Sequence, residues 1–320
     1  MVAIGAARRR RRAPVGDLTG RACLITGAAS GIGRATALAA ARRGAELLLT
    51  DIQAEKLHQT AELARAAGAR DVRCWAADIS DHDAVLAMAR DVHDARPCVD
   101  VVMNIAGISI WGPVEQLEHE HWRRQVEVNL MGPINVIECF VPPMIRAGRR
   151  GQLVNVSSSA GLFGLPWHAA YSASKFGLRG VSEVLRFDLR RHGIGVTLVC
   201  PGAVDTPLVE TVDIVGVDRD APEVRELAAR FRRHAVSPEQ VAEAIIAAVE
   251  RNRFLVLTSR DIQLGYWFQR KFALPYELAM RLLNDRLVAV APAARDGSTK
   301  PKAPSGSPTT RTHHGKALDA

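Results

Sequence analysis

Short, continuously apolar segments alternate with longer amphipathic ones along most of this chain. The apolar segments lie at residues 21–26, 45–50, 71–76, 99–104, 152–156, 195–200 and 254–258. A strand that is apolar on both faces must be covered on both faces, as in a parallel sheet packed between helices. We therefore predict an α/β fold, a doubly wound seven-stranded parallel sheet of the Rossmann type, formed as a single domain.

The amphipathic segments between these strands carry the signals of helices. Gly44 and Gly68 follow the first two segments, and Asp81 can cap the third. The predicted helices are 32–43, 53–67, 81–95, 118–147, 169–192 and 221–251. Pro142-Pro143 should break the fourth helix late, because proline lacks the amide hydrogen that a helix needs.

The charge of the chain is concentrated at its two ends. The net charge is +8, of which the run Arg8–Arg12 in residues 1–16 supplies +5 and residues 291–320 supply +3, so residues 17–290 are neutral. We expect a basic flexible arm at 1–16 and a disordered tail at 291–320. A neutral body has no overall attraction for phosphate backbones, so no nucleic-acid partner is expected, although the arm itself could contact RNA or anionic lipid.

The cysteines and the N-terminal region bear on the cellular compartment. Five cysteines occur with no close pair, and no sustained apolar stretch follows the arginine run. We expect no disulfide framework, no metal site, no signal peptide and no transmembrane segment, and a cytoplasmic location. Peripheral membrane contact stays open, because residues 259–290 are predicted to form one or two amphipathic helices around Pro275, with aromatic and basic side chains.

A glycine-rich turn directly follows the first predicted strand and opens the first predicted helix. It reads Thr26-Gly27-Ala28-Ala29-Ser30-Gly31-Ile32-Gly33. Glycines allow a tight turn and a close approach of the backbone to a pyrophosphate, and the helix N-terminus supplies free N–H groups and a partial positive charge. The turn therefore indicates a dinucleotide site, although a lone glycine-rich turn can also be a plain loop.

Asp51 lies at the end of the second predicted strand. An acid at this place accepts hydrogen bonds from the adenosine ribose and repels a 2′-phosphate, and the neighbouring Ile52 is apolar where an NADP site often has a base. The cofactor expected is NAD, with NADP less favoured. The alternative reading of Asp51 is a helix cap.

Tyr171 and Lys175 are spaced i, i+4 on a predicted helix and so share one face. A nearby ammonium group favours the phenolate and lowers the pKa of a tyrosine, which can then exchange a proton with an alcohol or carbonyl oxygen. Ser158, at the carboxyl end of the fifth strand, could hydrogen-bond the same oxygen. Taken alone, a Tyr-x-x-x-Lys pair is also common on helix surfaces.

The motifs together resemble the short-chain dehydrogenases/reductases, in the ordinary single-domain branch. The matching segments are TGAASGIG at 26–33, Asn104-Ile105-Ala106-Gly107, Asn129, Ser158, YSASK at 171–175 and Pro201-Gly202. The resemblance covers about residues 17–258, which would form the dinucleotide-binding and catalytic domain. One departure is Ile105, where the family usually has a second asparagine.

The resemblance implies a role for each matching residue. Tyr171 would be the general acid/base, Lys175 would lower its pKa and hold the nicotinamide ribose, Ser158 would polarise the substrate oxygen, and Asn129 would hold a water linking Lys175 to solvent. Asp78 would bond the adenine, with Ile79 packing nearby. The cofactor contacts expected are Gly27, Ser30, Gly31, Ile32, Gly33, Asp51, Ile52, Asp78, Ile79, Asn104, Ala106, Gly107, Tyr171, Lys175, Pro201, Gly202, Val204 and Thr206.

The expected activity is the interconversion of a secondary alcohol and a ketone on a bulky apolar substrate, such as a steroid, terpenoid or lipid. The loops near the predicted cleft hold Ile108, Ile110, Trp111, Phe163, Leu165, Trp167, Leu208 and Val209, with no Arg or Lys at 105–114 or 158–170. His168 could reach the pocket but reads more simply as a loop residue. An alternative function is a catalytically idle dinucleotide-binding regulator on the same fold.

The family resemblance also implies a homodimer or homotetramer. The helices expected to pair are about 118–141 and 169–192, and the first carries Val126, Leu130, Ile134 and Ile137 at helical spacing. A core-facing stripe would give the same pattern. Residues 262–283 could cover the cleft, rest on a lipid surface, seal the sheet edge or join an oligomer interface.

Overall fold

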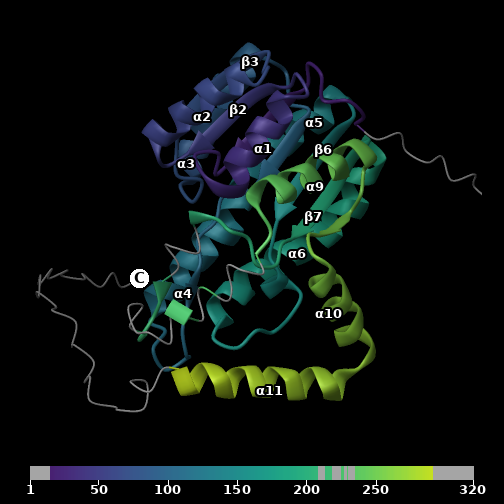
Figure 1. The fold of residues 1–320 in the computed structure, drawn as a ribbon. Helices are drawn as coiled ribbons and strands as arrows, with labels where there is room; N and C mark the ends of the chain where they lie inside the picture. Colours follow the sequence, from purple (N-terminus) through teal and green to yellow (C-terminus); the bar gives the residue numbers. More distant parts are fainter. Residues whose placement is uncertain (1–14, 208–212, 218–224, 227–228, 230–234, 291–320) are drawn as a thin grey trace, which may run out of the picture.

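The computed structural model describes residues 15–207, 213–217, 225–226, 229 and 235–290. A central sheet is flanked by helices on both faces (Figure 1). Its strands are β1 Ala22–Thr26, β2 Glu46–Asp51, β3 Asp71–Ala76, β4 Val101–Asn104, β6 Gly151–Val156, β7 Ile194–Cys200 and β9 Leu255–Leu257. All neighbours are parallel, in the order β3-β2-β1-β4-β6-β7-β9, which confirms the predicted doubly wound fold.

The apolar strands form because each one supplies side chains to two cores. In β1, Cys23 and Ile25 pack into the core on one face of the sheet, whereas Leu24 packs into the core on the other. Successive side chains of a strand point to opposite faces, so a strand with helices on both sides must be apolar throughout. The first core includes residues of the helices α1 Gly31–Ala41, α2 Ala54–Ala66 and α9 Pro238–Arg251, and the second includes residues of α3 His82–Ala95 and α5 Gly132–Ala147.

The helices begin and end close to the predicted positions. They are α1 Gly31–Ala41, α2 Ala54–Ala66, α3 His82–Ala95, α4 His119–Val126, α5 Gly132–Ala147, α6 Ala169–Asp188, α9 Pro238–Arg251, α10 Arg260–Lys271 and α11 Ala273–Val290. The Asp81 side chain accepts hydrogen bonds from the amides of Asp83 and Ala84, and Gly44 and Gly68 adopt positive φ, as the sequence signals indicated.

The predicted break at Pro142-Pro143 is wrong. α5 continues through both prolines to Ala147 and ends at Gly148, where φ is 62°. Val141 and Met144 are buried in the core against the sheet, and this packing outweighs the loss of two amide donors near the end of the helix.

The helix predicted at 118–147 contains an irregular turn. Residues Glu127–Met131, between α4 and α5, form a π-helical turn. The whole stretch His119–Ala147 is long and apolar enough to cross a membrane by length and composition. Half of its most apolar window is buried within the fold, where α5 packs on α3 and β4, so the protein core accounts for its apolar character.

The helix predicted at 221–251 is interrupted at residues 235–237. Residues 225, 226 and 229 are helical, and Val236 then forms an isolated bridge to Val204 before α9 begins. α9 begins at Pro238, because Ser237 caps it and exchanges hydrogen bonds with Gln240 in a capping box. Most of residues 218–234 lies outside the described part of the chain, as do Leu208 and Val209. The predicted arm and tail lie there too, except that Val15 is buried in the core, before the expected boundary.

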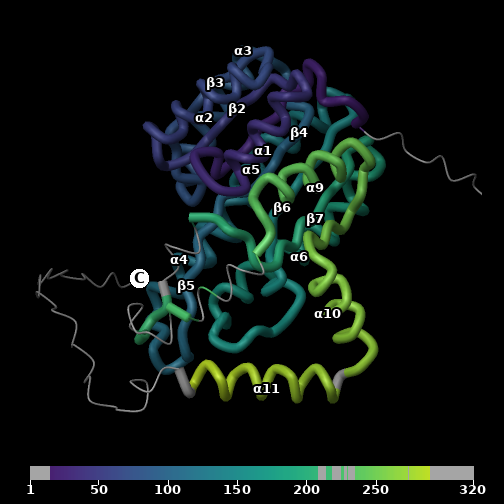
Figure 2. Tube along the Cα trace, in the orientation of Figure 1, coloured from purple at the N-terminus to yellow at the C-terminus, as the bar shows by residue number. Residues whose placement is uncertain are grey.

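The segment 259–290 forms two helices whose junction is at Phe272 rather than at Pro275. Pro275 instead occupies the first turn of α11, where a missing amide hydrogen has little effect. α10 leads away from β9, and α11 runs apart from the sheet and its covering helices (Figures 1 and 2).

The strand order places the chemistry of the molecule at one edge of the sheet. The chain reverses its winding direction between β1 and β4, and a crevice forms outside the carboxyl ends of strands at such a point. The loops that follow β1, β4, β6 and β7 all leave the sheet at this edge. A small second sheet, β5 Ile110–Trp111 paired with β8 Asp213–Ile214, joins two of these loops.

Candidate active site

The glycine-rich turn fits against the loop after β4 so closely that two positions exclude a side chain. Gly27 has φ of 68°, and a Cβ atom there would lie 2.7 Å from the Cα atom of Ala106. A Cβ atom on Gly33 would lie 2.0 Å from the carbonyl oxygen of Gly27. The turn therefore needs glycine for backbone conformation at one position and for packing at the other.

The N-terminus of α1 is left open by its own chain. Ser30 is the N-cap residue, but its side chain makes no cap hydrogen bond, and the first turn of α1 holds no acidic residue. The first amide groups of a helix carry a partial positive charge and need acceptors. An anionic pyrophosphate supplies both the charge and the acceptors, so the residues present fit a dinucleotide.

Asp51 is held beside this turn at the end of β2. Its Oδ2 atom accepts a hydrogen bond from the amide of Ala29 at 3.0 Å, and its Oδ1 atom accepts one from the amide of Gln53 at 2.9 Å. The second contact is a local turn just before α2, as in the alternative interpretation of Asp51. The first fixes the carboxylate next to the glycine-rich turn, and Ile52 beside it is 69% exposed.

The residues expected near the adenosine differ in exposure. Asp78 is exposed and accepts from the amide and hydroxyl of Ser80, while Ile79 is buried and packs against Gly132. Asn104 differs from the expectation of a side-chain lining role. It is buried and donates to Asn155 at 2.9 Å, so its side chain ties β4 to β6.

Two further loops complete this edge of the sheet. A Cβ atom on Gly107 would lie 2.8 Å from Asn129 Oδ1 and 3.3 Å from Lys175 Nζ, so this glycine adjoins the catalytic candidates. After β7, Thr206 lies against Gly31 of the glycine-rich turn. In the same loop Pro201 and Val204 are buried, Gly202 is half-buried against Ile262, and the carbonyl of Pro201 accepts from the amide of Ser159.

Tyr171, Ser158 and Lys175 converge where α6 crosses the end of β6. Tyr171 is 9% exposed, and Ser158 lies close enough to its hydroxyl to lower its pKa. Lys175 Nζ lies 5.7 Å from the centre of the Tyr171 ring and donates to the carbonyl of Val156 at 3.2 Å. Ser157 Oγ donates to the carbonyl of Lys175 and thereby holds the helix on the strand end.

Burial governs the protonation of both groups. It raises the pKa of Tyr171 above its usual value of 10.0, with the Ser158 hydrogen bond opposing, and it lowers the pKa of Lys175 from 10.5 to about 8. The lowering of the Tyr171 pKa by Lys175 that we expected is not seen in this geometry. The hydroxyl is held as a neutral phenol, which is the form that donates a proton.

Asn129 lies in the π-helical turn and is buried. Its Oδ1 accepts from the amide of Ile108 at 2.9 Å, and its Nδ2 donates to the Ile108 carbonyl at 2.9 Å and to Gln125 Oε1 at 2.6 Å. The side chain thus clamps the loop after β4 and has its main bonding positions filled. The π-helical turn brings this side chain to the loop after β4. Such turns frequently mark functional sites.

Two residues near the site were missed or undervalued by the sequence interpretation. Gln125 is buried, and its side chain accepts a hydrogen bond from Asn129 and donates one to the carbonyl of Ile110. It belongs to no sequence motif, so only the structure reveals this role. The His168 ring lies 4.3 Å from the Trp111 ring and 6.3 Å from the Tyr171 ring, between centroids. Trp167 before it adopts φ of 65°, a conformation uncommon for a bulky residue, so this loop holds local strain.

His168 is held in one tautomer beside Tyr171. Its Nδ1 lies 2.6 Å from the carbonyl of Pro166, which can only accept, so Nδ1 carries the hydrogen. Burial lowers the pKa of His168, and the imidazole is neutral at pH 7. Its position three residues before Tyr171 was the only signal in the sequence.

The predicted apolar cleft is only partly formed by the expected residues. Phe163 and Leu165 pack with Ile262 and Tyr266 of α10 in a third apolar cluster, and Ile110 is buried. Trp111 and Trp167 remain half-exposed near Tyr171, and Ile108 is half-buried beside Asn129. The loop side chains near β9 therefore serve packing, because α10 covers them.

An open nucleotide turn and a buried Tyr-Lys pair at the switch point of a doubly wound sheet define a dinucleotide-dependent oxidoreductase. The family profile described as short chain dehydrogenase matches residues 21–214. The chain belongs to the short-chain dehydrogenase/reductase family, as its motifs indicated.

Two curated relatives show the range of the similarity. A putative oxidoreductase, SadH, of Mycobacterium tuberculosis is 36% identical over 246 residues, covering 76% of this chain and 87% of that protein. A 1-deoxy-11-beta-hydroxypentalenate dehydrogenase of Streptomyces exfoliatus is 33% identical over 247 residues, covering 76% and 85%.

Solved structures of the family contain either nicotinamide cofactor. A short chain dehydrogenase/reductase from Burkholderia phymatum, in complex with NAD, has a TM-score of 0.71 at 29% identity and covers 80% of this chain and 94% of its own. A metagenomic short-chain oxidoreductase in complex with NADP has a TM-score of 0.61 at 30% identity, covering 76% and 96%. The family and its NAD(P)-binding Rossmann fold are thus shown, whereas the choice between the two cofactors is a separate question.

Proposed function

We propose that this protein interconverts a secondary alcohol and a ketone, with Tyr171 as the group that exchanges a proton with the substrate oxygen. The convergence of Tyr171, Ser158 and Lys175 at the carboxyl edge of the sheet carries the proposal. Bound nicotinamide cofactor would supply or accept the hydride. Ser158, beside the tyrosine hydroxyl, is placed to orient the same substrate oxygen.

The residues proposed to hold the cofactor follow the edge of the sheet. The N-terminus of α1 would bind the pyrophosphate through the amides near Ser30 and Gly31, and Asp51 would accept from the adenosine ribose. Asp78 and Ile79 would meet the adenine, Ala106 and Gly107 the adjoining ribose, and the loop at Pro201–Thr206 the nicotinamide. Asn104 would take part only through its backbone.

We propose NAD as the preferred cofactor, on the position of Asp51. Its carboxylate is fixed next to the turn by the Ala29 amide, so a 2′-phosphate there would meet a negative charge. Wild-type kcat/KM should be higher with NAD. The double substitution Asp51→Ala with Ile52→Arg should shift the kcat/KM ratio towards NADP, by about tenfold or more for a change worth about 1.4 kcal/mol. A wild-type enzyme that prefers NADP would refute the assignment.

We propose a bulky apolar substrate. Trp111 and Trp167 are half-exposed close to Tyr171, and the loops at 105–114 and 158–170 contain no Arg or Lys to bind a carboxylate or phosphate. Neutral His168 adds a single acceptor among these apolar groups. A relative that acts on a pentalenate, as its name states, is compatible with this class.

Steady-state kinetics on ketones and alcohols of increasing apolar size test the substrate proposal. Burial of about 200 Å² more apolar surface could contribute roughly 5 kcal/mol before ordering costs, so kcat/KM should rise with size. A short polar hydroxy acid as the best substrate would contradict the apolar site and leave the dehydrogenase assignment intact.

We also propose that the chain forms a homo-oligomer through α5 and α6. Three large apolar side chains of α6 are exposed: Phe176 (40%), Val184 (59%) and Phe187 (69%). A soluble monomer rarely exposes so much apolar surface along one helix. A monomeric mass by light scattering at micromolar concentration would contradict this.

A further inference from the structure

The C-terminal helices α10 and α11 expose an unusual concentration of large apolar side chains. Fifteen large apolar side chains are exposed in the described residues, and eight of them lie between 264 and 283. They are Leu264, Trp267, Phe268, Phe272, Leu274, Leu278, Leu282 and Leu283. A contiguous exposed apolar surface of this kind marks a site of interaction rather than ordinary surface variation.

One face of α10 attaches this pair of helices to the fold. Ile262 and Tyr266 pack with Phe163, and Tyr276 of α11 accepts a hydrogen bond from the amide of Gly164 at 2.9 Å. At 3.6 residues per turn, Leu264 and Trp267 lie on the face of α10 opposite to Ile262 and Tyr266. The attachment therefore leaves the outer face uncovered.

The outer face combines aromatic and basic side chains. Trp267 and Phe268 lie 5.8 and 5.0 Å from Phe272, between ring centroids, and form an aromatic corner at the junction of the two helices. Arg260 and Lys271 fall on the same outer face of α10 by helical spacing and are exposed. Aromatic rings beside cationic chains are typical of helices that lie in a membrane interface.

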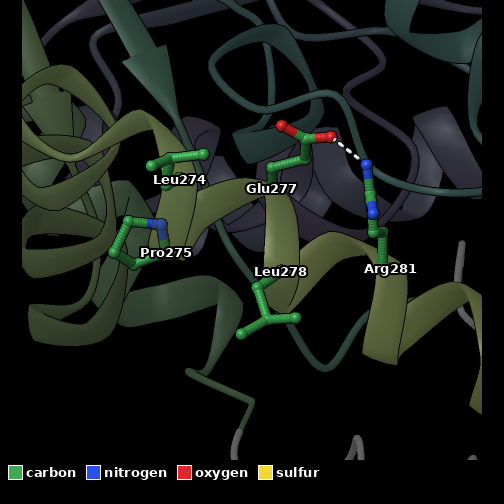
Figure 3. Close-up of a pocket in the computed structure, with 5 residues that line it drawn as sticks. All are labelled: Leu274, Pro275, Glu277, Leu278 and Arg281. Carbon is green, nitrogen blue, oxygen red and sulfur yellow. Dashed lines mark hydrogen bonds and ion pairs between the residues drawn. The ribbon is translucent and has the colours of Figure 1, made fainter.

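α11 continues this surface as a line of leucines. Leu274, Leu278 and Leu282 follow one another at four-residue spacing and are 79%, 59% and 53% exposed. Figure 3 shows the shallow groove around Leu274 and Pro275, with Leu278 pointing away from the Glu277–Arg281 ion pair. In Figure 1, α11 stands apart from the sheet and its helices, so this line is not covered by the rest of the described chain.

The charge of these helices distinguishes between two binding partners, a second copy of the chain and a lipid surface. Residues 260–290, which form the two helices, contain five basic and three acidic residues, a net charge of +2, whereas residues 17–259 have 27 basic and 29 acidic residues, a net charge of −2. Pairing of this surface with itself in a second copy would bring two positive regions together. An anionic lipid surface offers both apolar volume and opposite charge.

We propose that α10 and α11 form a peripheral membrane-binding surface that docks on anionic lipid through the outer aromatic and leucine side chains. Lipid binding does not depend on the proposed function. Its location does favour that function, because the loop of Phe163 and Gly164, on which this surface rests, leads directly to Tyr171. An apolar substrate dissolved in the bilayer would reach the site over a short path.

Vesicle flotation of the full chain tests the proposal without substrate or cofactor. Vesicles of phosphatidylcholine are compared with vesicles that also contain phosphatidylglycerol. The wild-type chain should float with the anionic vesicles, and less at high salt because salt screens the attraction. Trp267→Glu and Leu278→Glu should each lower the vesicle partition coefficient at least about tenfold, since each removes apolar burial and adds an opposing charge.

Matched variants test whether flotation depends on this surface rather than on another part of the chain. Leu63→Glu, at a side chain on α2 that is 42% exposed, introduces the same charge elsewhere and should leave flotation unchanged. A chain without residues 1–14, which keeps the buried Val15, should also float. The blue shift of tryptophan fluorescence on adding anionic vesicles should disappear in Trp267→Phe, which should still bind.

Three results would overturn the proposal. The first is flotation of Trp267→Glu and Leu278→Glu equal to the wild type, with unaltered circular dichroism. The second is loss of flotation only on removing residues 1–14. The third is a wild-type chain that does not float but whose mass by light scattering halves in Leu278→Glu, which would assign the surface to a second copy.

Discussion

Tyr171→Phe should lower kcat for alcohol oxidation or ketone reduction by about 10² to 10⁴-fold, the usual contribution of a general acid or base. Only the hydroxyl beside Ser158 is lost. The ring is 9% exposed and stays packed in the same place, so nucleotide affinity should change little. Single-turnover kinetics together with NADH fluorescence titration measure the two effects separately.

Phe272→Tyr provides the matched control for that experiment, in an assay without lipid. Phe272 lies at the end of α10, is 44% exposed, and the substitution makes the reverse change of a single hydroxyl away from the site. It should leave kcat within about twofold, as for a surface change. A Tyr171→Phe enzyme with near wild-type kcat would remove Tyr171 from the chemistry and would favour the alternative of an idle dinucleotide-binding regulator.

The sheet could be predicted because its strands are buried on both faces. A segment such as residues 21–26, in which positions 22–25 are all apolar, is best buried on both faces of a sheet. The errors fall where tertiary packing outweighs a local signal. Pro142 and Pro143 ought to end a helix, yet the burial of Val141 and Met144 against the sheet keeps α5 intact.

The site was predictable in part for a different reason. The glycine-rich turn and the Tyr171–Lys175 pair could be recognised from their residue spacing, because each motif lies within a single turn or a single helix. Gln125 hydrogen-bonds Asn129, and His168 contacts the Trp111 ring. Residue spacing along the chain does not reveal such side-chain contacts. The packing of Phe163 against α10 could not be predicted, because the position of α10 depends on tertiary packing alone.

Lys175→Met should stabilise the chain at pH 7 in the absence of nucleotide, while reducing turnover. Burial lowers the pKa of Lys175 from 10.5 to about 8, so the folded state holds its proton less tightly than the unfolded state does. At pH 7 both states are protonated, and the buried charge costs the folded state roughly 3 kcal/mol at 1.36 kcal/mol per unit of pKa. Loss of the hydrogen bond to the Val156 carbonyl offsets about 1 kcal/mol of the gain.

The same shift fixes the direction of the pH dependence. Between about pH 8 and 10.5 the unfolded chain binds more protons at this site than the folded chain, so the free energy of unfolding contributed by Lys175 rises with pH. In Lys175→Met this rise should be absent. Denaturant unfolding at pH 7, 8, 9 and 10 compares the two slopes, with Lys56→Met on the exposed face of α2 as the control that should alter neither stability nor slope. A Lys175→Met chain that is less stable than the wild type at pH 7, with the same slope, would show that the ammonium group is not held at a cost, and that its hydrogen bond to Val156 outweighs its burial.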